Sequence, residues 1–208
     1  VGYNQTVKEP SEMNPLGLGI LGSGKGTNCR AILEQIRAGA LPAEARVVVS
    51  DAVDAPILDI AREFSVPNNY LPPGHFRTRL EPDMEAELVQ LLRDAAVELV
   101  ILAGFMRVLK EPMLRAFPRR ILNIHPSLLP KFPGLEAWKQ ALAAGEKVTG
   151  CTVHYVDEQI DHGDIIAQRE VSILPDDTAE TLHTRIQLAE RELYPAVIRQ
   201  FCRDEREA

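Results

Sequence analysis

The sequence predicts an α/β protein with one domain, in which a mostly parallel, twisted sheet carries helices on both faces and ends in an antiparallel C-terminal extension. Short apolar runs of strand length alternate with helical patterns through the first half of the chain. This alternation is typical of parallel strands joined by covering helices. In the second half, two strand-like runs at 151–156 and 164–173 flank an acidic loop, which favours antiparallel pairing.

Five runs of strand length are expected in the first part of the chain, at 16–21, 46–50, 66–71, 99–103 and 121–125. The clearest helix is expected at 83–96, where apolar residues form one stripe at helical spacing: Met84, Leu88, Leu91, Leu92 and Ala95. Two shorter helices are expected at 28–38 and 56–64. Residues 1–15 are polar and contain two prolines, so we expect a flexible leader there and a single domain over 16–208.

A long helix is expected after residue 177. Asp177 and Glu180 have the spacing of a capping box. Apolar residues downstream form a stripe for burial: Leu182, Ile186, Ala189, Leu193 and Val197. Pro195 cannot donate a backbone hydrogen bond, so the helix is expected to kink or restart at that residue.

The composition is that of an ordinary globular protein: 208 residues, 45% hydrophobic and 25% charged, with 23 Lys and Arg, 30 Asp and Glu and a formal net charge of −7. An acidic chain without a basic stripe argues against nucleic-acid binding. The longest uncharged apolar run, 99–106, is far shorter than the ~20 residues of a membrane span, and no signal peptide is expected. Cys29, Cys151 and Cys202 form no CxxC pair, so reduced thiols in a cytoplasmic protein are expected.

The first strand ends in a glycine-rich turn, residues 22–28 (GSGKGTN), that leads into a helix. Such a turn lets the backbone approach a ligand, and the N–H groups at a helix N-terminus favour an anion, above all a phosphate. The turn is not a P-loop, because Lys25 is followed by Gly26, and the glycines at 17, 19 and 22 lie in the strand rather than after it, unlike a dinucleotide fingerprint. Alternatives are a tight turn without a ligand, or a nucleotide whose ribose binds Asp51.

The strand at 121–125 ends in Asn123 and His125, which alternation places on the same face. Open α/β sheets place their sites at the carboxyl ends of strands. An amide beside an imidazole can stabilise oxyanion charge and transfer a proton. The alternative is a structural histidine bonded to a neighbouring carbonyl. Three prolines then favour a stiffened loop at 127–134 beside this position.

The acidic loop 157–164 holds four carboxylates within eight residues. One interpretation is a solvated charged loop. A second is a metal site at Asp161, His162 and Asp164, although the spacing matches neither an EF-hand nor HExxH. A third is that one carboxylate orients His125, and spacing alone does not identify which one. His154 is interpreted as a structural histidine and Trp138 as a packing residue.

Six segments together resemble the glycinamide ribonucleotide transformylases, also called phosphoribosylglycinamide formyltransferases, of purine biosynthesis. They are GSGKGTN at 22–28, LAGFMRVL at 102–109, LNIHPSLLPKFPG at 122–134, GCTVHYV at 150–156, IDHGDII at 160–166 and AERELYP at 189–195. The resemblance runs from residue 16 to residue 201. It implies a Rossmann-like formyltransferase fold whose N-terminal half binds the ribonucleotide and whose C-terminal half binds folate and is catalytic.

The resemblance also implies roles for single residues. The catalytic triad of the family corresponds to Asn123, His125 and Asp161. The phosphate-binding turn and the acid that binds the ribose hydroxyls correspond to Gly26, Thr27, Asn28 and Glu190. The walls of the folate cleft correspond to Met106, Arg107, Val108 and Leu109, together with the loop that runs from Val156 to Asp161. For the folate glutamate tail the resemblance implies Arg79 or Arg77, and Lys131 begins a mobile loop over the site.

The implied reaction transfers the formyl group of 10-formyltetrahydrofolate to the amine of glycinamide ribonucleotide. The amine is itself the nucleophile, so direct transfer through a tetrahedral intermediate needs no Ser or Cys. We expect small-molecule substrates, no metal, no nucleic-acid or membrane partner, and a monomer or homodimer in the cytoplasm. The chain departs from the family at Glu136, Ala137 and Trp138, where relatives often carry histidine and threonine, and at Asp164, where they commonly carry proline.

Three other functions are weighed against this one. Methionyl-tRNA formyltransferase carries a second, basic domain, for which 208 residues with a net charge of −7 are expected to leave no room. Formyltetrahydrofolate hydrolase carries an additional N-terminal regulatory domain, whereas about fifteen residues precede the first expected strand. A nucleotide-binding regulatory protein would keep the turn at 22–28 but have no use for Asn123, His125 and Asp161 together.

Overall fold

The computed structural model describes residues 15–207, and within them the strands form one seven-stranded sheet in the order β3-β2-β1-β4-β5-β6-β7. The strands are β1 (Leu16–Leu21), β2 (Ala43–Ser50), β3 (Asn68–Tyr70), β4 (Leu99–Leu102), β5 (Ile121–His125), β6 (Val148–Tyr155) and β7 (Ile165–Ser172). Strands β1 to β5 pair in parallel, whereas β6 pairs antiparallel with β5 and β7 with β6. This confirms the predicted parallel sheet with its antiparallel C-terminal extension. The expected leader at 1–15 lies outside the described residues except for residue 15.

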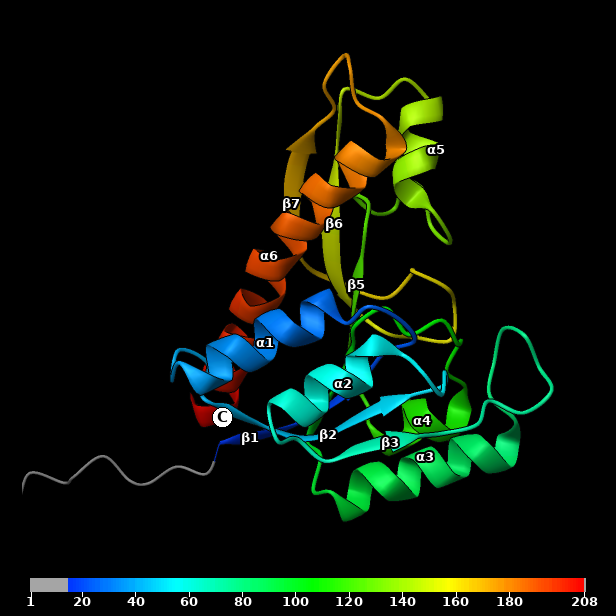
Figure 1. The fold of residues 1–208 in the computed structure, drawn as a ribbon, viewed down its shortest axis with the longest axis vertical. Coiled ribbons are helices and arrows are strands. Elements are labelled where there is room, and N and C mark those ends of the chain that lie inside the picture. Colours follow the sequence, from blue (N-terminus) through cyan, green and yellow to red (C-terminus); the bar gives the residue numbers. More distant parts are fainter. Residues whose placement is uncertain (1–14, 208) are drawn as a thin grey trace, which may run out of the picture.

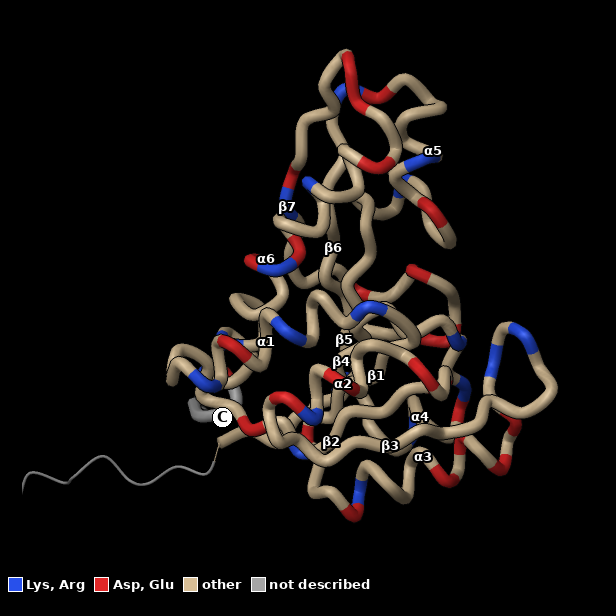
Figure 2. Tube along the Cα trace, viewed as in Figure 1, with Lys and Arg blue, Asp and Glu red and all other residues tan. Residues whose placement is uncertain are grey.

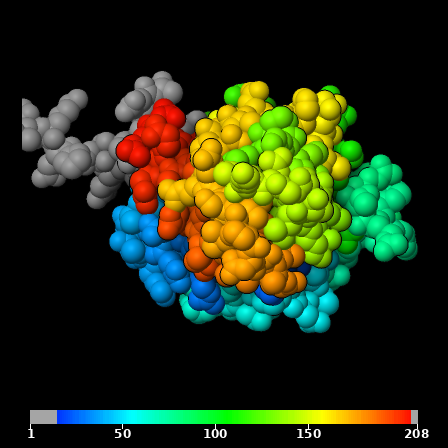
Figure 3. All heavy atoms as spheres, turned by 90° about the horizontal axis from the view of Figure 1, so that it is seen from above, coloured from blue at the N-terminus to red at the C-terminus, as the bar shows by residue number. Residues whose placement is uncertain are grey.

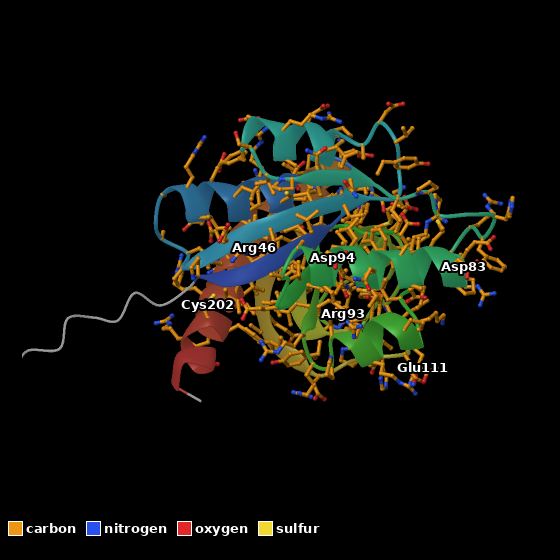
Figure 4. The ribbon with its side chains drawn as sticks, turned by 90° about the horizontal axis from the view of Figure 1, so that it is seen from below. Arg46, Asp83, Arg93, Asp94, Glu111 and Cys202 are labelled. Atoms are coloured by element: carbon orange, nitrogen blue, oxygen red, sulfur yellow. The ribbon has the colours of Figure 1, made fainter. Side chains whose placement is uncertain are left out.

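Helices cover both faces of the sheet (Figure 1). They are α1 (Thr27–Arg37), α2 (Pro56–Glu63), α3 (Pro82–Asp94), α4 (Glu111–Ala116), α5 (Ala137–Ala143) and α6 (Ala179–Glu207). One core joins α1, α2 and α6 to the sheet, and the other joins α3 and α4 to the opposite face. Strand alternation explains the division, because Ile20 and Leu21 point to opposite faces and enter different cores. Figure 4 shows α3 and α4 from below, with Asp83 and Asp94 at opposite ends of α3.

The glycines of β1 serve packing rather than ligand binding. A Cβ at Gly17 would lie 2.5 Å from the carbonyl oxygen of Ala96, and one at Gly19 would lie 2.7 Å from a methyl group of Leu92. Both are closer than real Cβ atoms approach. The end of α3 therefore presses directly on the backbone of β1, which confirms that this GxG is not a dinucleotide motif.

Several boundaries differ from those predicted. Strand β2 begins at Ala43, three residues before the predicted run, because Ala43, Glu44 and Ala45 also pair with β1. Strand β3 covers only residues 68–70, since Val66 instead donates its N–H to the carbonyl of Ala61 at the end of α2. Helix α4 was not predicted, because a six-residue helix is too short to show an apolar stripe.

The predicted capping box of α6 is wrong by one residue. Thr178 and Thr181 cap the helix reciprocally, with the N–H of Thr181 donating to Thr178 Oγ1 at 3.2 Å and the N–H of Thr178 donating to Thr181 Oγ1 at 2.9 Å. Asp177 instead accepts the N–H of Leu174 at 2.7 Å and pairs with Arg185. The acidic side chain thus closes the preceding turn, which leaves the two threonines to cap the helix.

Helix α6 runs through Pro195 as one element, so the predicted restart does not occur. Proline removes a single backbone donor, and the flanking side chains Tyr194 and Val197 are buried in the core. The Tyr194 hydroxyl lies 2.8 Å from the carbonyl oxygen of Leu122 and 3.2 Å from that of Leu102. This anchor holds α6 against the last residue of β4 and the second residue of β5.

The strand order reverses between β1 and β4, because the chain moves outward from β1 to β3 and then returns to the other side of β1. Open α/β sheets bind ligands outside the carboxyl ends of the strands at such a reversal. The segments that follow β1, β4 and β5 therefore meet there. Among the described residues, no helix is long and apolar enough to cross a bilayer.

Candidate active site

The turn after β1 leads into α1 at the position where the strand order reverses. Gly26 is the N-cap of α1 and has a left-handed backbone with φ 69°. A Cβ on it would lie 2.9 Å from atoms of Ile57 and Ile60 in α2, so only glycine combines this conformation with the close helix packing. The first N–H groups of a helix have no intrahelical acceptor, which makes the start of α1 suited to an anion.

Asn28 links this turn to α6. Its Nδ2 donates to Glu190 Oε2 at 2.9 Å, and both side chains are buried. Burial raises the pKa of Glu190 to about 7, although the Asn28 hydrogen bond opposes the rise. Asn28 Oδ1 is buried with no partner in the structure. The structure therefore brings the predicted turn and the predicted acid together. Beside them, Asn28 Oδ1 is an acceptor that no described residue satisfies.

The second group of predicted residues lies at the end of β5. His125 Nδ1 is 3.2 Å from Asp161 Oδ2, and its Nε2 is 2.8 Å from the carbonyl oxygen of Phe132. Asn123 Nδ2 is 3.4 Å from Asp161 Oδ1. The structure thus selects Asp161 from the four acids of the 157–164 loop as the carboxylate that faces His125.

Asp161 is held in place by its backbone and by the opposite loop. Its φ is +51°, a left-handed conformation that Asp tolerates better than most residues, and its Oδ2 accepts the N–H of Gly134 at 2.8 Å. Burial opposes ionisation, but the charge of His125 and the N–H of Gly134 help to hold the pKa of Asp161 below its usual value. Asp161 is therefore a carboxylate at neutral pH.

The ionisation of His125 depends on two opposing effects. Burial lowers its pKa below the usual value, while the Asp161 charge and the Phe132 carbonyl work against this decrease. Both ring nitrogens face acceptor oxygens, so a proton on His125 would be hydrogen-bonded on both sides. The imidazole is thus positioned to take up and release a proton next to the amide of Asn123.

His154 belongs to this cluster, which the sequence analysis missed. It lies opposite Asn123 in the β5–β6 ladder. Its Nδ1 is 2.8 Å from the carbonyl oxygen of Tyr155, and its Nε2 is 3.1 Å from Asn123 Nδ2. With Nδ1 donating to the carbonyl, Nε2 accepts from Asn123. The strand alternation of CTVHYV was the signal available, but it does not reveal which neighbour a strand residue faces.

The predicted folate-cleft segment, 106–109, lies against the glycine-rich turn. Met106 donates its N–H to Ser23 Oγ at 2.8 Å, and its side chain is 56% exposed. Arg107 pairs with Asp51 at 2.6 Å and donates to the carbonyl oxygens of Phe76 and Arg77. Asp51, the alternative ribose ligand, is thus engaged by Arg107, and its other carboxylate oxygen is buried with no hydrogen-bond partner among the described residues.

The other predicted cleft residues lie on the same segment or beside it. Val108 is bridged to Arg79 and donates its N–H to the carbonyl oxygen of Thr78 at 2.8 Å. Leu109 is buried in the core that joins α3 and α4 to the sheet. Arg79 is exposed and its guanidinium lies 4.0 Å from the ring centroid of Phe76. Val156 donates its N–H to the carbonyl oxygen of Ile121 at 2.9 Å, so it continues β6 beside β5.

The candidate metal ligands of the acidic loop are turned apart. His162 pairs with Asp157 at 2.9 Å, and Asp164 pairs with Arg119 at 2.8 Å, while Asp161 faces His125. Within residues 15–207, no group of three or more His, Cys, Asp or Glu side chains has the arrangement of a metal site. The interpretation that the loop orients His125 is the one that this geometry supports.

A family model described as formyl transferase matches residues 18–198. The chain belongs to the formyl transferase family. The match spans all the segments described above, from β1 to α6, so the predicted fold and family are confirmed.

Three similar proteins place this formyl transferase more closely. It is 41% identical over 182 residues to a phosphoribosylglycinamide formyltransferase of Bacillus subtilis, covering 88% of this chain and 92% of the relative. It is 46% identical over 181 residues to a trifunctional purine biosynthetic protein of Drosophila pseudoobscura, covering 86% of this chain but only 13% of that relative. A crystal structure of glycinamide ribonucleotide transformylase 1 from Symbiobacterium toebii superposes with a TM-score of 0.88 at 47% identity, covering 92% of this chain and 89% of that one.

Proposed function

We propose that this formyl transferase transfers the formyl group from 10-formyltetrahydrofolate to the amine of glycinamide ribonucleotide in purine biosynthesis. The products are formylglycinamide ribonucleotide and tetrahydrofolate. The observation that carries the proposal is the cluster of Asn123, His125 and Asp161, which lies beside an anion-binding turn at the strand-order reversal. The relatives named for this reaction, aligned along nearly their whole length, support it.

The ribonucleotide fits the turn between β1 and α1. Its 5′-phosphate would accept hydrogen bonds from the backbone around Gly26, Thr27 and Asn28, where the helix dipole also favours negative charge. Glu190 and the unpartnered oxygen of Asn28 are acceptors for ribose hydroxyls. The amine would then point towards Asn123 and His125.

The folate fits the other side of the site. Met106 and Val108 present apolar surface together with Val156, as a planar ring system requires, and backbone groups of the same segment can bind its polar edge. Arg79 lies at the rim of this wall and is exposed, so it can pair with the glutamate carboxylates. Bound there, the folate supplies the formyl group, and the side chains of this chain supply the hydrogen bonds and the proton transfer.

The cluster can stabilise the charge that develops during transfer. When the substrate amine attacks the formyl carbon, negative charge accumulates on the formyl oxygen. Asn123 Nδ2 can donate to that oxygen, and a protonated His125 can do so once its Nε2 gives up the carbonyl oxygen of Phe132. Asp161 stabilises the imidazolium and can accept, through water, the proton that the amine loses, and a proton passes to the departing folate nitrogen. Atoms and charge balance without any further reactant.

Direct transfer agrees with the state of the cysteines. Burial raises the pKa of the Cys29 thiol to about 12 and that of Cys151 to about 12. Neither forms the thiolate that a covalent intermediate requires. The high pKa values of these two thiols support the substrate amine as the nucleophile.

We further propose that the enzyme works in the cytoplasm on small molecules, as a monomer or homodimer and without a nucleic-acid or membrane partner. Buried cysteines without a disulfide fit a reducing compartment. Lys and Arg are interleaved with Asp and Glu along the chain and form no extended basic stripe among the described residues (Figure 2).

The decisive experiment follows consumption of 10-formyltetrahydrofolate with and without glycinamide ribonucleotide. Turnover that depends on the ribonucleotide and yields its formylated product supports the transferase. Equal turnover without the amine would assign a hydrolase, and binding of the ribonucleotide without any turnover would assign a regulatory protein.

Because Asn123 and His125 act on one oxygen, the double alanine variant should lose less activity than the product of the two single losses.

A further inference from the structure

Two aromatic rings outside the site stack face to face. Trp138 on α5 and His183 on α6 have ring centroids 3.7 Å apart and planes inclined by only 2°. Viewed from above, the segment that carries α5 (yellow-green) packs directly against the start of α6 (orange; Figure 3). The mechanism proposed above uses neither residue, and Trp138 lies where the sequence departs from its family.

His183 lies on the face of α6 that leads to the ribonucleotide site. Gln187 and Glu190 follow it at four and seven residues, so the three share one side of the helix. His183 Nε2 is 3.3 Å from Gln187 Nε2, and Glu190 bonds Asn28 in the turn. At ~1.5 Å of rise per residue, His183 stands about 10 Å along the axis from the acid at the site.

Lys25 connects this face to the phosphate turn itself. It is an exposed residue of the turn, and burial of His183 together with the positive charge of Lys25 lowers the pKa of that imidazole. The other charges nearby are already engaged: Lys139 on α5 pairs with Glu136, and Glu180 on α6 faces Thr178 and Lys139. A half-buried imidazole on α6 and an exposed lysine of the turn therefore both lie near a helix N-terminus suited to an anion.

We propose that Lys25 and His183 form an outer wall of the ribonucleotide phosphate subsite, and that His183 takes up a proton when the 5′-phosphate binds. The inference rests on the proposed function and deepens it. Two negative charges on the phosphate would offset the Lys25 ammonium and favour the imidazolium. In the neutral ring Nε2 accepts from Gln187, so the proton from solvent adds to Nε2, and the Gln187 amide turns its oxygen towards it.

Trp138 is the positioning residue in this arrangement. Its indole fixes the plane of the imidazole, and an aromatic face stabilises a cation stacked on it. The stack also joins α5, which follows the loop over Asp161 and His125, to the helix that carries Glu190.

The test is an NMR titration of the histidine rings of the full-length protein labelled with ¹⁵N-histidine, with the His183 signal assigned from its absence in His183→Gln. Glycinamide ribonucleotide should raise the pKa of His183 by at least one unit, which corresponds to about tenfold tighter binding to the protonated form. The ribonucleoside without its phosphate should leave the signal unmoved. Calorimetry in two buffers of different ionisation enthalpy should record proton uptake that is lost in His183→Gln.

Kinetics of matched variants separate this role from a structural one. His183→Gln should raise the KM for the ribonucleotide about fivefold to tenfold near pH 6, with convergence to wild type above pH 8 and with unchanged kcat and folate KM. Trp138→Phe should keep the effect and Trp138→Ala should weaken it. His162→Gln, at an exposed histidine paired with Asp157, should behave as wild type at every pH.

Two outcomes would overturn the inference. If the ribonucleotide binds and is formylated while the His183 signal does not move, the imidazole is not part of the phosphate subsite, although the proposed function stands. If wild type neither binds nor formylates the ribonucleotide, both proposals fail together.

Discussion

Asn123 Nδ2 lies 3.1 Å from His154 Nε2, across the antiparallel pair of β5 and β6. Because His154 Nδ1 faces the carbonyl oxygen of Tyr155, the ring presents an acceptor to Asn123 and orients its amide. The Nδ2 group that would donate to the formyl oxygen is thus aimed by a residue that need not touch either substrate.

We therefore expect His154→Ala to reduce kcat about fivefold, the effect of losing one hydrogen bond of ~1 kcal/mol, while the KM of each substrate changes little. His154→Gln, which can present an acceptor to Asn123, should recover part of the rate. Steady-state kinetics of both variants test this. A wild-type kcat in His154→Ala would show that Asn123 needs no such support.

Asp161→Asn keeps the shape of the side chain and removes its charge. We expect kcat to fall by roughly 10²–10³-fold, since the imidazolium loses its counter-charge. The Asp161 charge raises the pKa of His125, so its loss lowers that pKa further, and the alkaline limb of the pH–rate profile should move to lower pH. Asp157→Asn in the same loop is the matched control and should retain most of the rate, because Asp157 pairs with His162 instead. An unmoved limb would mean that protonated His125 is not the active form.

Glu190 should make the stability of the fold depend on pH. Burial raises the pKa of Glu190 from 4.5 to about 7, so between these values the folded state binds more protons than the unfolded state, and the free energy of unfolding falls as pH rises. The full loss is on the order of 3 kcal/mol and is complete above pH 7. Glu190→Gln keeps the acceptor for Asn28 and should remove this loss.

Urea unfolding at pH 5 and pH 8 measures this effect. The free energy of unfolding of Glu190→Gln, relative to that of wild type, should be higher at pH 8 than at pH 5. If the difference in the free energy of unfolding between variant and wild type is the same at both pH values, Glu190 stays ionised in the folded protein over this range.

Two neighbouring glycines should respond differently to alanine. Gly26→Ala forces a left-handed residue against Ile57 and Ile60 and should cost roughly 1–3 kcal/mol of stability. A Cβ on Gly24 meets no atom within 4 Å, so Gly24→Ala should fold as stably as wild type but crowd the approach of the phosphate and raise the ribonucleotide KM. Thermal unfolding and kinetics together test the pair. An unchanged KM in Gly24→Ala would place the phosphate elsewhere.

The acidic loop supplies a test of the metal interpretation. His162 and Asp164 pair with Asp157 and Arg119, so His162→Ala and Asp164→Ala should keep at least about half of the wild-type activity, the scale expected for loss of an exposed ion pair. Incubation with a chelator should leave the rate unchanged. Abolition of activity by the chelator, restored by adding back a metal, would replace the mechanism proposed here.

Local patterns in the sequence were sufficient for the elements of the fold. The strands at 16–21 and 121–125 have the predicted boundaries, since each is a short apolar run whose alternation and length are set by neighbours in the chain. The alternation of strands and helices likewise determined the parallel sheet, because few other arrangements bury both kinds of element. The resemblance to the family motifs then indicated the candidate residues of the site.

Only the tertiary structure decided which side chains meet. Asp161 faces His125 although three other acids share its loop, because its left-handed backbone and the N–H of Gly134 turn it inward. His154 joins the site through the register of β6 against β5, and Trp138 meets His183 because α5 docks on α6. Each of these contacts joins residues more than twenty positions apart, and sequence periodicity records which face is buried but not what lies across from it.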